Sequence, residues 1–111
     1  MNELTAIRRL LSEAPASPKK ISTCLDQGDV SGAYHAAKEL DMSAIASHLE
    51  EILATPNRHY RLLRELLAKT NAEMSKELGI NTMTLSRRET GKYPVKPEHL
   101  FAVRFLFSQA A

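Results

Sequence analysis

The sequence has almost no cysteine: Cys24 is the only one among 111 residues. A single thiol excludes an intramolecular disulfide and a cysteine-rich zinc site, which fits a protein of the reducing cytosol. The four histidines are scattered and have no carboxylate or cysteine at the spacing of metal ligands. We therefore expect neither a bound metal nor another cofactor.

Long apolar runs and catalytic signatures are also missing. No uninterrupted apolar stretch reaches the length of about 18 residues that crosses a membrane. The first thirteen residues include four charged ones where a signal peptide needs an apolar run. No glycine-rich phosphate loop occurs, and no nucleophile has an evident base partner. These absences predict a cytoplasmic protein that is not an enzyme and does not contact a membrane.

What the sequence does contain is an uneven distribution of charge. Residues 1–56 carry 5 Lys and Arg against 8 Asp and Glu, a net charge of −3, and residues 57–111 carry 10 against 5, a net charge of +5. A basic half beside an acidic half is typical of a DNA-binding module joined to a module that does not contact DNA. A chain this short buries only about two-thirds of its unfolded surface, so self-association would be a natural way to cover the rest.

The apolar residues have helical spacing nearly everywhere, and no alternating run predicts a strand. We therefore predict an all-α fold. A boundary is expected at Thr55 to Asn57, where Pro56 disfavours helical geometry in the preceding residue and the charge changes sign. In residues 1–56 we expect a first helix after Asn2 and a second after Ser17, with Pro18 in its first position and its end at Gly28. A third helix is expected to follow Asp29 or Ser31 and to end at Leu40, and a fourth to begin at Ser43. This acidic helical region is expected to serve dimerisation or partner binding.

The pattern in residues 57–111 is more definite. We predict helices from Arg58 to near Lys69, from Asn71 through Leu78, over 83–90 and over 98 to about 108. Gly79 can supply the left-handed C-terminal stop of the second of these helices, and Asn81 can cap the third.

The segment from Asn71 to Lys92 is the centre of the functional argument. Two helices can cross steeply only if a tight turn joins them, and Gly79 can adopt the positive φ that such a turn requires. Ile80 and Leu85 should then point inward. Four residues remain on the outer side of the second helix, whose N-terminal end can enter a major groove: Thr82, Met83, Ser86 and Arg87.

Two of these outer side chains have a specific chemistry toward base pairs. The guanidinium of Arg87 matches the two acceptors of guanine in the major groove. Met83 can make an apolar contact with the methyl group of thymine. The pattern therefore predicts contacts to base edges from this helix.

Residues 71–95, NAEMSKELGINTMTLSRRETGKYPV, resemble the helix-turn-helix of the Cro and phage-repressor (XRE) family. The resemblance covers about half the chain and implies a lambda-repressor-like bundle in residues 57–111. It implies that Asn71 contacts a phosphate and orients the reading helix, that Gly79 is the turn glycine, and that Glu89, Gly91 and Lys92 mark the end of the reading helix. The DNA-binding residues expected from the pattern and the resemblance together are Asn71, Thr82, Met83, Thr84, Ser86, Arg87, Arg88, Lys92 and Lys96.

This resemblance implies a sequence-specific regulator of transcription, a repressor, that binds double-stranded DNA. It is expected to bind a palindrome as a homodimer, with two reading helices about 34 Å apart. The chain departs from the family at Asn71, where glutamine is usual, and at Arg88, where an apolar core residue is usual. Either the stem of Arg88 packs inward with its head exposed, or the helix is rotated.

Two other functions fit the same residues. In the first, an antitoxin-like or adaptor protein binds a protein through residues 1–56 and its operator through residues 57–111. In the second, a helical module binds only proteins and its motif has lost DNA affinity, for which Arg88 is the best argument. The apolar stretch 100–107, in which only Arg104 is polar, adds an association surface that either residues 1–56 or a second subunit should cover.

Overall fold

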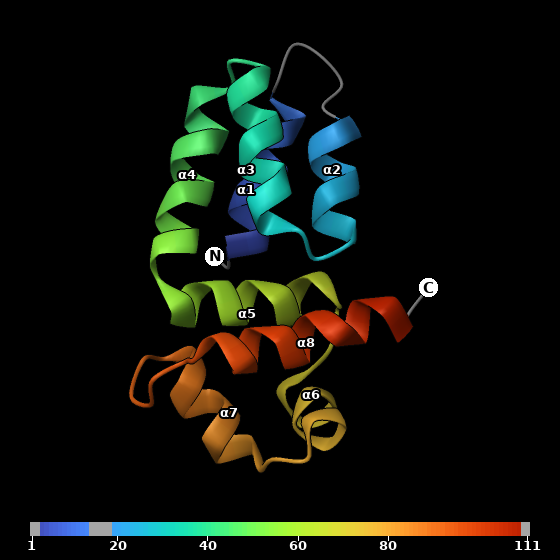
Figure 1. Ribbon diagram of the computed structural model, residues 1–111, viewed down its shortest axis with the longest axis vertical. Helices are drawn as coiled ribbons and strands as arrows, with labels where there is room; N and C mark the ends of the chain where they lie inside the picture. The colour runs from blue at the N-terminus through green and yellow to red at the C-terminus, as the bar shows by residue number, and fades with distance from the viewer. Residues whose placement is uncertain (1–2, 14–18, 110–111) are drawn as a thin grey trace. The chain divides into compact units, whose positions relative to one another are not determined.

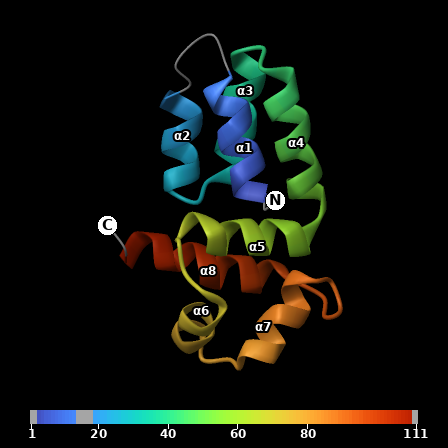
Figure 2. The same ribbon diagram turned by 180° about the vertical axis from the view of Figure 1, so that it is seen from behind.

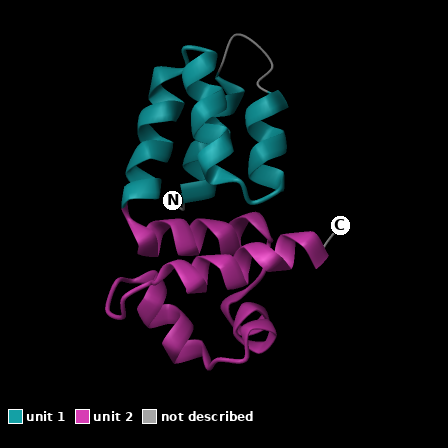
Figure 3. Ribbon diagram, in the orientation of Figure 1, with its two compact units in different colours: residues 1–54 teal, residues 55–111 magenta. Residues whose placement is uncertain are grey.

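The computed structural model describes residues 3–13 and 19–109, and every regular element within these ranges is a helix (Figure 1). The expected all-α class is therefore confirmed. The chain divides into two compact units, residues 1–54 and residues 55–111 (Figure 3). The helices of the described ranges are α1 (Glu3–Ser12), α2 (Lys19–Asp26), α3 (Val30–Glu39), α4 (Ser43–Ala54), α5 (Pro56–Leu66), α6 (Asn71–Leu78), α7 (Thr82–Glu89) and α8 (Pro97–Gln109).

The first unit is a set of four helices in which α3 packs against α2 and α4, and α1 packs against α4. Seen from behind, α1 lies in front of the space between α2 and α4 (Figure 2). All four helices contribute buried apolar side chains, so the unit has its own core. The buried residues that make up this core are Ile7, Ile21, Leu25, Val30, Ala33, Ala36, Ala37, Ile45, Ala46, Leu49 and Ile52.

Local signals set the ends of the helices in this unit. The carboxylate of Asp29 accepts a hydrogen bond of 2.8 Å from the backbone N–H of Gly32, so Asp29, and not Ser31, caps α3. Helix α2 ends at Asp26, earlier than expected, because Gly28 already has a φ of 73°. The caps predicted at Asn2 and at Ser17 with Pro18 lie outside the described residues.

The second unit begins with a helix that starts earlier than the sequence predicts. Helix α5 starts at Pro56 and not at Arg58, because a proline at the first helical position loses no helical hydrogen bond and has a suitable φ. Thr55 lies outside the helical segment, as expected from Pro56. It is the N-cap of α5, the helix that follows it. The helix ends at Leu66, short of the predicted Lys69, because Ala68 adopts a φ of 56°.

In this unit α5 packs against α7 and α8, and α6 packs against α7. The prediction that Leu85 points inward is confirmed, whereas Ile80, for which the same was expected, is only half-buried. The fully buried side chains of the unit come from all four of its helices: Tyr60, Leu62, Leu63, Met74, Leu85 and Val103. This core fixes α7 on a base formed by α5.

Helix α8 has one covered face and one open face. Val103 is fully buried, but Phe101 is 67% exposed and Phe105 is 62% exposed. The two phenylalanines are four residues apart and therefore lie on the same face of the helix. The other helices of the second unit thus leave an apolar stripe uncovered. None of the described helices is long and apolar enough to cross a membrane.

Candidate nucleic-acid interface

The start of α6 is held by a pair of reciprocal hydrogen bonds. The hydroxyl of Thr70 accepts a bond of 3.1 Å from the N–H of Glu73, and the carboxylate of Glu73 accepts one of 2.9 Å from the N–H of Thr70. The backbone bond and then the side-chain bond to Thr70 hold the pKa of Glu73 below its ordinary value. This capping box fixes the position of Asn71, the first residue of α6.

A tight turn at Gly79 joins α6 to α7. Gly79 has a φ of 70° and a ψ of 29°, in the left-handed region that glycine adopts without strain. A Cβ atom at this position would meet nothing within 4 Å, so the backbone conformation and not a lack of space favours glycine here. In Figures 1 and 2, α6 is seen nearly end-on and α7 runs across the view, so their axes are far from parallel.

Helix α7 begins at a capped end and is anchored by its inner face. The side-chain oxygen of Asn81 accepts a bond of 2.7 Å from the N–H of Thr84, which confirms Asn81 as the cap. Leu85 is fully buried, and Glu89, one turn further on, is only 8% exposed. Because these two side chains face inward, the opposite side of α7 faces outward.

Glu89 forms an ion pair that the sequence patterns do not reveal. Its two carboxylate oxygens accept hydrogen bonds of 2.7 and 2.9 Å from Nε and Nη2 of Arg64 on α5. Arg64 also donates to the carbonyl of Lys69 at 3.0 Å, and the bond to Glu89 is the main reason why the pKa of Arg64 is raised. The resemblance assigned Glu89 only to the end of the reading helix. In the structure this residue ties α7 to α5.

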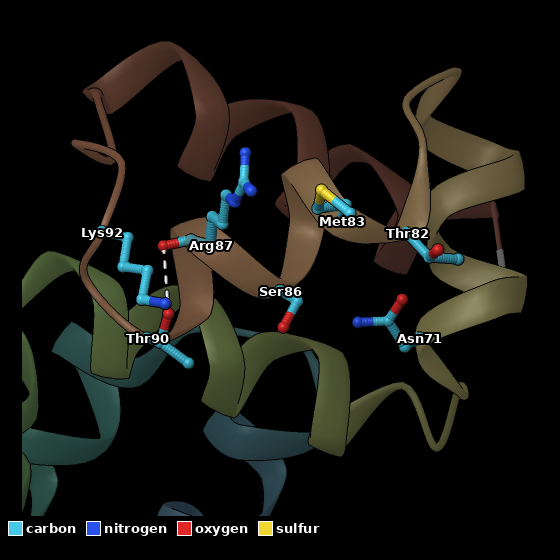
Figure 4. Close-up of a pocket in the computed structure, with 7 residues that line it drawn as sticks. All are labelled: Asn71, Thr82, Met83, Ser86, Arg87, Thr90 and Lys92. Atoms are coloured by element: carbon cyan, nitrogen blue, oxygen red, sulfur yellow. Dashed lines mark hydrogen bonds between the residues drawn. The ribbon is translucent and has the colours of Figure 1, made fainter.

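The outward side of α7 carries a hollow of about 520 Å³ (Figure 4). Its lining contains two cationic side chains, one amide, three hydroxyls and one thioether, and no carboxylate. Six of the expected DNA-binding residues lie together there, and Thr90 joins them. The lining consists of Asn71, Thr82, Met83, Ser86, Arg87, Thr90 and Lys92.

The close-up view shows two rows of side chains on this surface. Thr82, Ser86 and Thr90 follow one another along α7 on the side of Asn71, and the side chains of Met83 and Arg87 point away from that row (Figure 4). Met83 is 59% exposed, so its side chain is open to a ligand. The surface therefore offers hydroxyl and amide groups along one edge and an apolar group with a guanidinium along the other.

Three expected DNA-binding residues lie outside this lining. Arg88 is half-buried and donates from Nη1 to the hydroxyl of the buried Tyr60 at 3.3 Å, so its head turns toward α5. Thr84 is half-buried beside its cap. Lys96 is exposed, and its backbone N–H donates to Nδ1 of His99 at 3.0 Å. Burial, followed by the charge of Arg88, lowers the pKa of His99.

Two residues of the surface were missed by the sequence analysis. Thr90 lines the hollow and donates from its hydroxyl to the carbonyl of Arg87 at 3.4 Å. Tyr93 accepts a hydrogen bond of 2.7 Å from Nη1 of Arg87. The only sequence feature that links Tyr93 to Arg87 is their separation of six positions. An aromatic residue at this distance from an arginine is too common to predict a contact by itself.

Within residues 3–13 and 19–109, no group of three or more His, Cys, Asp or Glu side chains is arranged to hold a metal ion. The surface is a cationic, polar face of an all-α protein. Comparisons with protein-family models, with curated proteins and with solved structures gave no match to the chain. Its function is therefore argued from its own residues.

Proposed function

We propose that the protein is a transcriptional regulator that binds double-stranded DNA in a sequence-specific manner and acts as a repressor. In this proposal α6 and α7 form a helix-turn-helix, and α7 lies in the major groove. The hollow carries the proposal, because it combines Arg87 and Lys92 with amide and hydroxyl groups and contains no carboxylate. Its unit, residues 55–111, has the same net charge of +5 as residues 57–111 because residues 55 and 56 are uncharged.

The two rows of side chains suggest that one side of the surface contacts phosphates and the other contacts bases. Asn71 and Ser86 lie on a polar edge suited to phosphate oxygens, which accept bonds from amides and hydroxyls. Met83 and Arg87 form the edge suited to bases, since a thioether contacts a thymine methyl and a guanidinium binds guanine. Lys92 adds a positive charge for the DNA backbone. Arg88 is not part of this proposal, because its guanidinium is bonded to Tyr60.

A homodimer is part of the same proposal. Phe101 and Phe105 form an exposed apolar stripe on α8, and a second copy of the chain offers the same stripe. A two-fold pairing of identical stripes is self-complementary and would place two reading helices on a palindrome.

Selection from a pool of random duplex DNA at two salt concentrations tests the proposal. The wild type should enrich a palindrome, and its affinity should fall steeply with salt as phosphate-bound counterions are released. Arg87→Ala should relax the preference at one position of each half-site, at a cost of about 1–3 kcal/mol. Arg8→Ala, which removes an exposed arginine from α1, is the matched control and should leave the selected sequence unchanged.

The opposite result has an equally clear meaning. If the wild type enriches no sequence and shows no salt-sensitive binding, DNA binding is excluded, and an adaptor that binds a protein is the better function. The first unit has a second hollow of about 300 Å³ between α3 and α4. Tyr34, Lys38 and Glu50 are among the residues that line this hollow, so a partner search would begin with variants at these positions.

A further inference from the structure

We propose that Tyr93 is a specificity-determining positioning residue that orients the guanidinium of Arg87 so that one edge of it binds guanine. This inference rests on the proposed DNA-binding function and deepens it. It concerns a residue outside the predicted recognition helix. The argument begins with how Tyr93 holds Arg87.

Tyr93 contacts Arg87 at both ends of the arginine. The backbone N–H of Tyr93 donates to the carbonyl of Arg87 at 3.1 Å, and the tyrosine hydroxyl accepts from Nη1 of the guanidinium at 2.7 Å. The centre of the guanidinium also lies 5.4 Å from the centroid of the tyrosine ring, within the range of a cation–π interaction. The hydroxyl of Thr90 donates to the same carbonyl at 3.4 Å. The loop after α7 thus folds back on its last turn.

This arrangement decides which donors of Arg87 remain for a ligand. A guanidinium has five N–H groups, and one on Nη1 is engaged with the hydroxyl of Tyr93. No described residue bonds to Nε or Nη2, and the edge that these two atoms form presents two parallel donors. Two parallel donors are what the O6 and N7 atoms of guanine accept in the major groove.

Without this contact the guanidinium would be free to bind whatever anion is near. An unrestrained arginine binds phosphate as readily as a base, and phosphate contacts carry no sequence information. A fixed guanidinium loses less freedom when it binds, so its preferred partner is the one whose acceptors match its orientation. Tyr93 therefore acts on the choice of base more than on total affinity.

The test compares Tyr93→Phe and Tyr93→Ala with the wild type. The first variant removes only the hydroxyl and the second removes the ring as well, while both keep every charge. Each should lower the preference for guanine at one position per half-site, by about fivefold to tenfold for Tyr93→Phe and more for Tyr93→Ala. The salt dependence of binding should stay at the wild-type value, because the number of phosphate contacts is unchanged.

A double-mutant cycle with Arg87→Ala shows whether the effect passes through the arginine. If it does, Arg87→Ala with Tyr93→Phe should have the same base preference as Arg87→Ala alone. DNA with 7-deazaguanine at the preferred position lacks the N7 acceptor, and it should weaken wild-type binding toward the level of Arg87→Ala. Tyr34→Phe removes a tyrosine hydroxyl from the first unit and should change neither property.

Three results would overturn the inference while DNA binding itself stands. These are an unchanged guanine preference in both Tyr93 variants, a double variant that loses more preference than Arg87→Ala, and wild-type binding that is indifferent to 7-deazaguanine. A wild type without salt-sensitive DNA binding would remove the proposed function, and the inference with it. Salt-sensitive DNA binding by the wild type therefore distinguishes failure of the Tyr93 inference from failure of the proposed function.

Discussion

The guanidinium of Arg64 on α5 donates two hydrogen bonds, of 2.7 and 2.9 Å, to the carboxylate of Glu89 on α7. The side chain of Glu89 is 7% exposed and that of Arg64 is 17% exposed, so both charges are largely removed from water. Parallel bonds of this kind fix an angle as well as a distance. The orientation of α7 therefore depends on an ion pair as well as on apolar packing.

Breaking this ion pair should destabilise the protein strongly. Arg64→Ala removes both hydrogen bonds to the buried carboxylate of Glu89, which keeps only the longer ion pair with Arg61 at 4.0 Å, and should lower the free energy of unfolding by about 3 kcal/mol. Urea denaturation followed by circular dichroism measures the loss. The control is Arg9→Ala, which removes the exposed pair of Arg9 with Glu13 and should cost less than about 1 kcal/mol. Equal losses in the two variants would contradict the role given to Arg64.

Two residues with positive φ should respond to substitution in opposite directions. Gly79 has a φ of 70° and Ala68 has a φ of 56°. Gly79→Ala forces a side chain into the left-handed region and should lower stability by about 1 kcal/mol, whereas Ala68→Gly relieves the same strain and should raise stability by up to about 1 kcal/mol. The urea midpoints, compared at constant m-value, report both changes. A loss of stability in Ala68→Gly would be inconsistent with this view of the turn after α5.

His59 on α5 should make the protein less stable in weak acid. Burial, followed by the charge of Arg104, lowers the pKa of His59 from its ordinary value of 6.5, and its buried Nε2 has no hydrogen-bond partner among the described residues. The unfolded chain therefore binds the proton more readily than the folded one. The free energy of unfolding should be highest above the unfolded pKa and fall as the pH drops from there toward the folded pKa.

Denaturation between about pH 7 and about pH 5 tests this expectation. His59→Gln cannot take up the proton and should show a shallower decline, with part of the remaining slope due to His99, whose pKa is also lowered. A wild-type slope in His59→Gln would assign the acid sensitivity to other groups.

The exposed stripe on α8 should control the oligomeric state. Replacing Phe101 and Phe105 together by serine should convert a dimer to the 12.4 kDa monomer, with the dissociation constant raised at least about 30-fold, the effect of losing one interface hot spot of about 2 kcal/mol. Sedimentation equilibrium over a range of concentrations measures this. Leu40→Ser changes an exposed apolar residue on the other unit and should leave the mass unchanged. A wild type that is monomeric throughout would exclude the dimer.

Features set by neighbouring residues could be predicted from the sequence. The cap at Asn81 and the stop at Gly79 depend on contacts a few positions away, and both lie where they were expected. The start of α5 was misplaced because Pro56 was interpreted only through its effect on the preceding residue. The positive φ of Ala68 could not be predicted, because alanine usually favours a helix.

Long-range partners could not be predicted in the same way. Arg64 and Glu89 are 25 positions apart, and Tyr60 and Arg88 are 28 apart, so no local pattern links them. Arg88 was expected among the DNA-binding residues, but one step along a helix turns a side chain by about 100° from that of Arg87, and the guanidinium of Arg88 donates to Tyr60. The four expected residues of α7 that line the hollow, Thr82, Met83, Ser86 and Arg87, follow from helical geometry once the inward position of Leu85 is known.

The separation of roles on α7 bears on how the protein could change in evolution. Leu85 and Glu89 hold the helix in place, whereas Thr82, Met83 and Ser86 are exposed. Substitution of exposed residues away from special contacts changes stability by about 0.5 kcal/mol or less. Duplicated copies of this chain could therefore diverge in the ligands they select while keeping the same scaffold, and no compensating mutation in the core would be needed first.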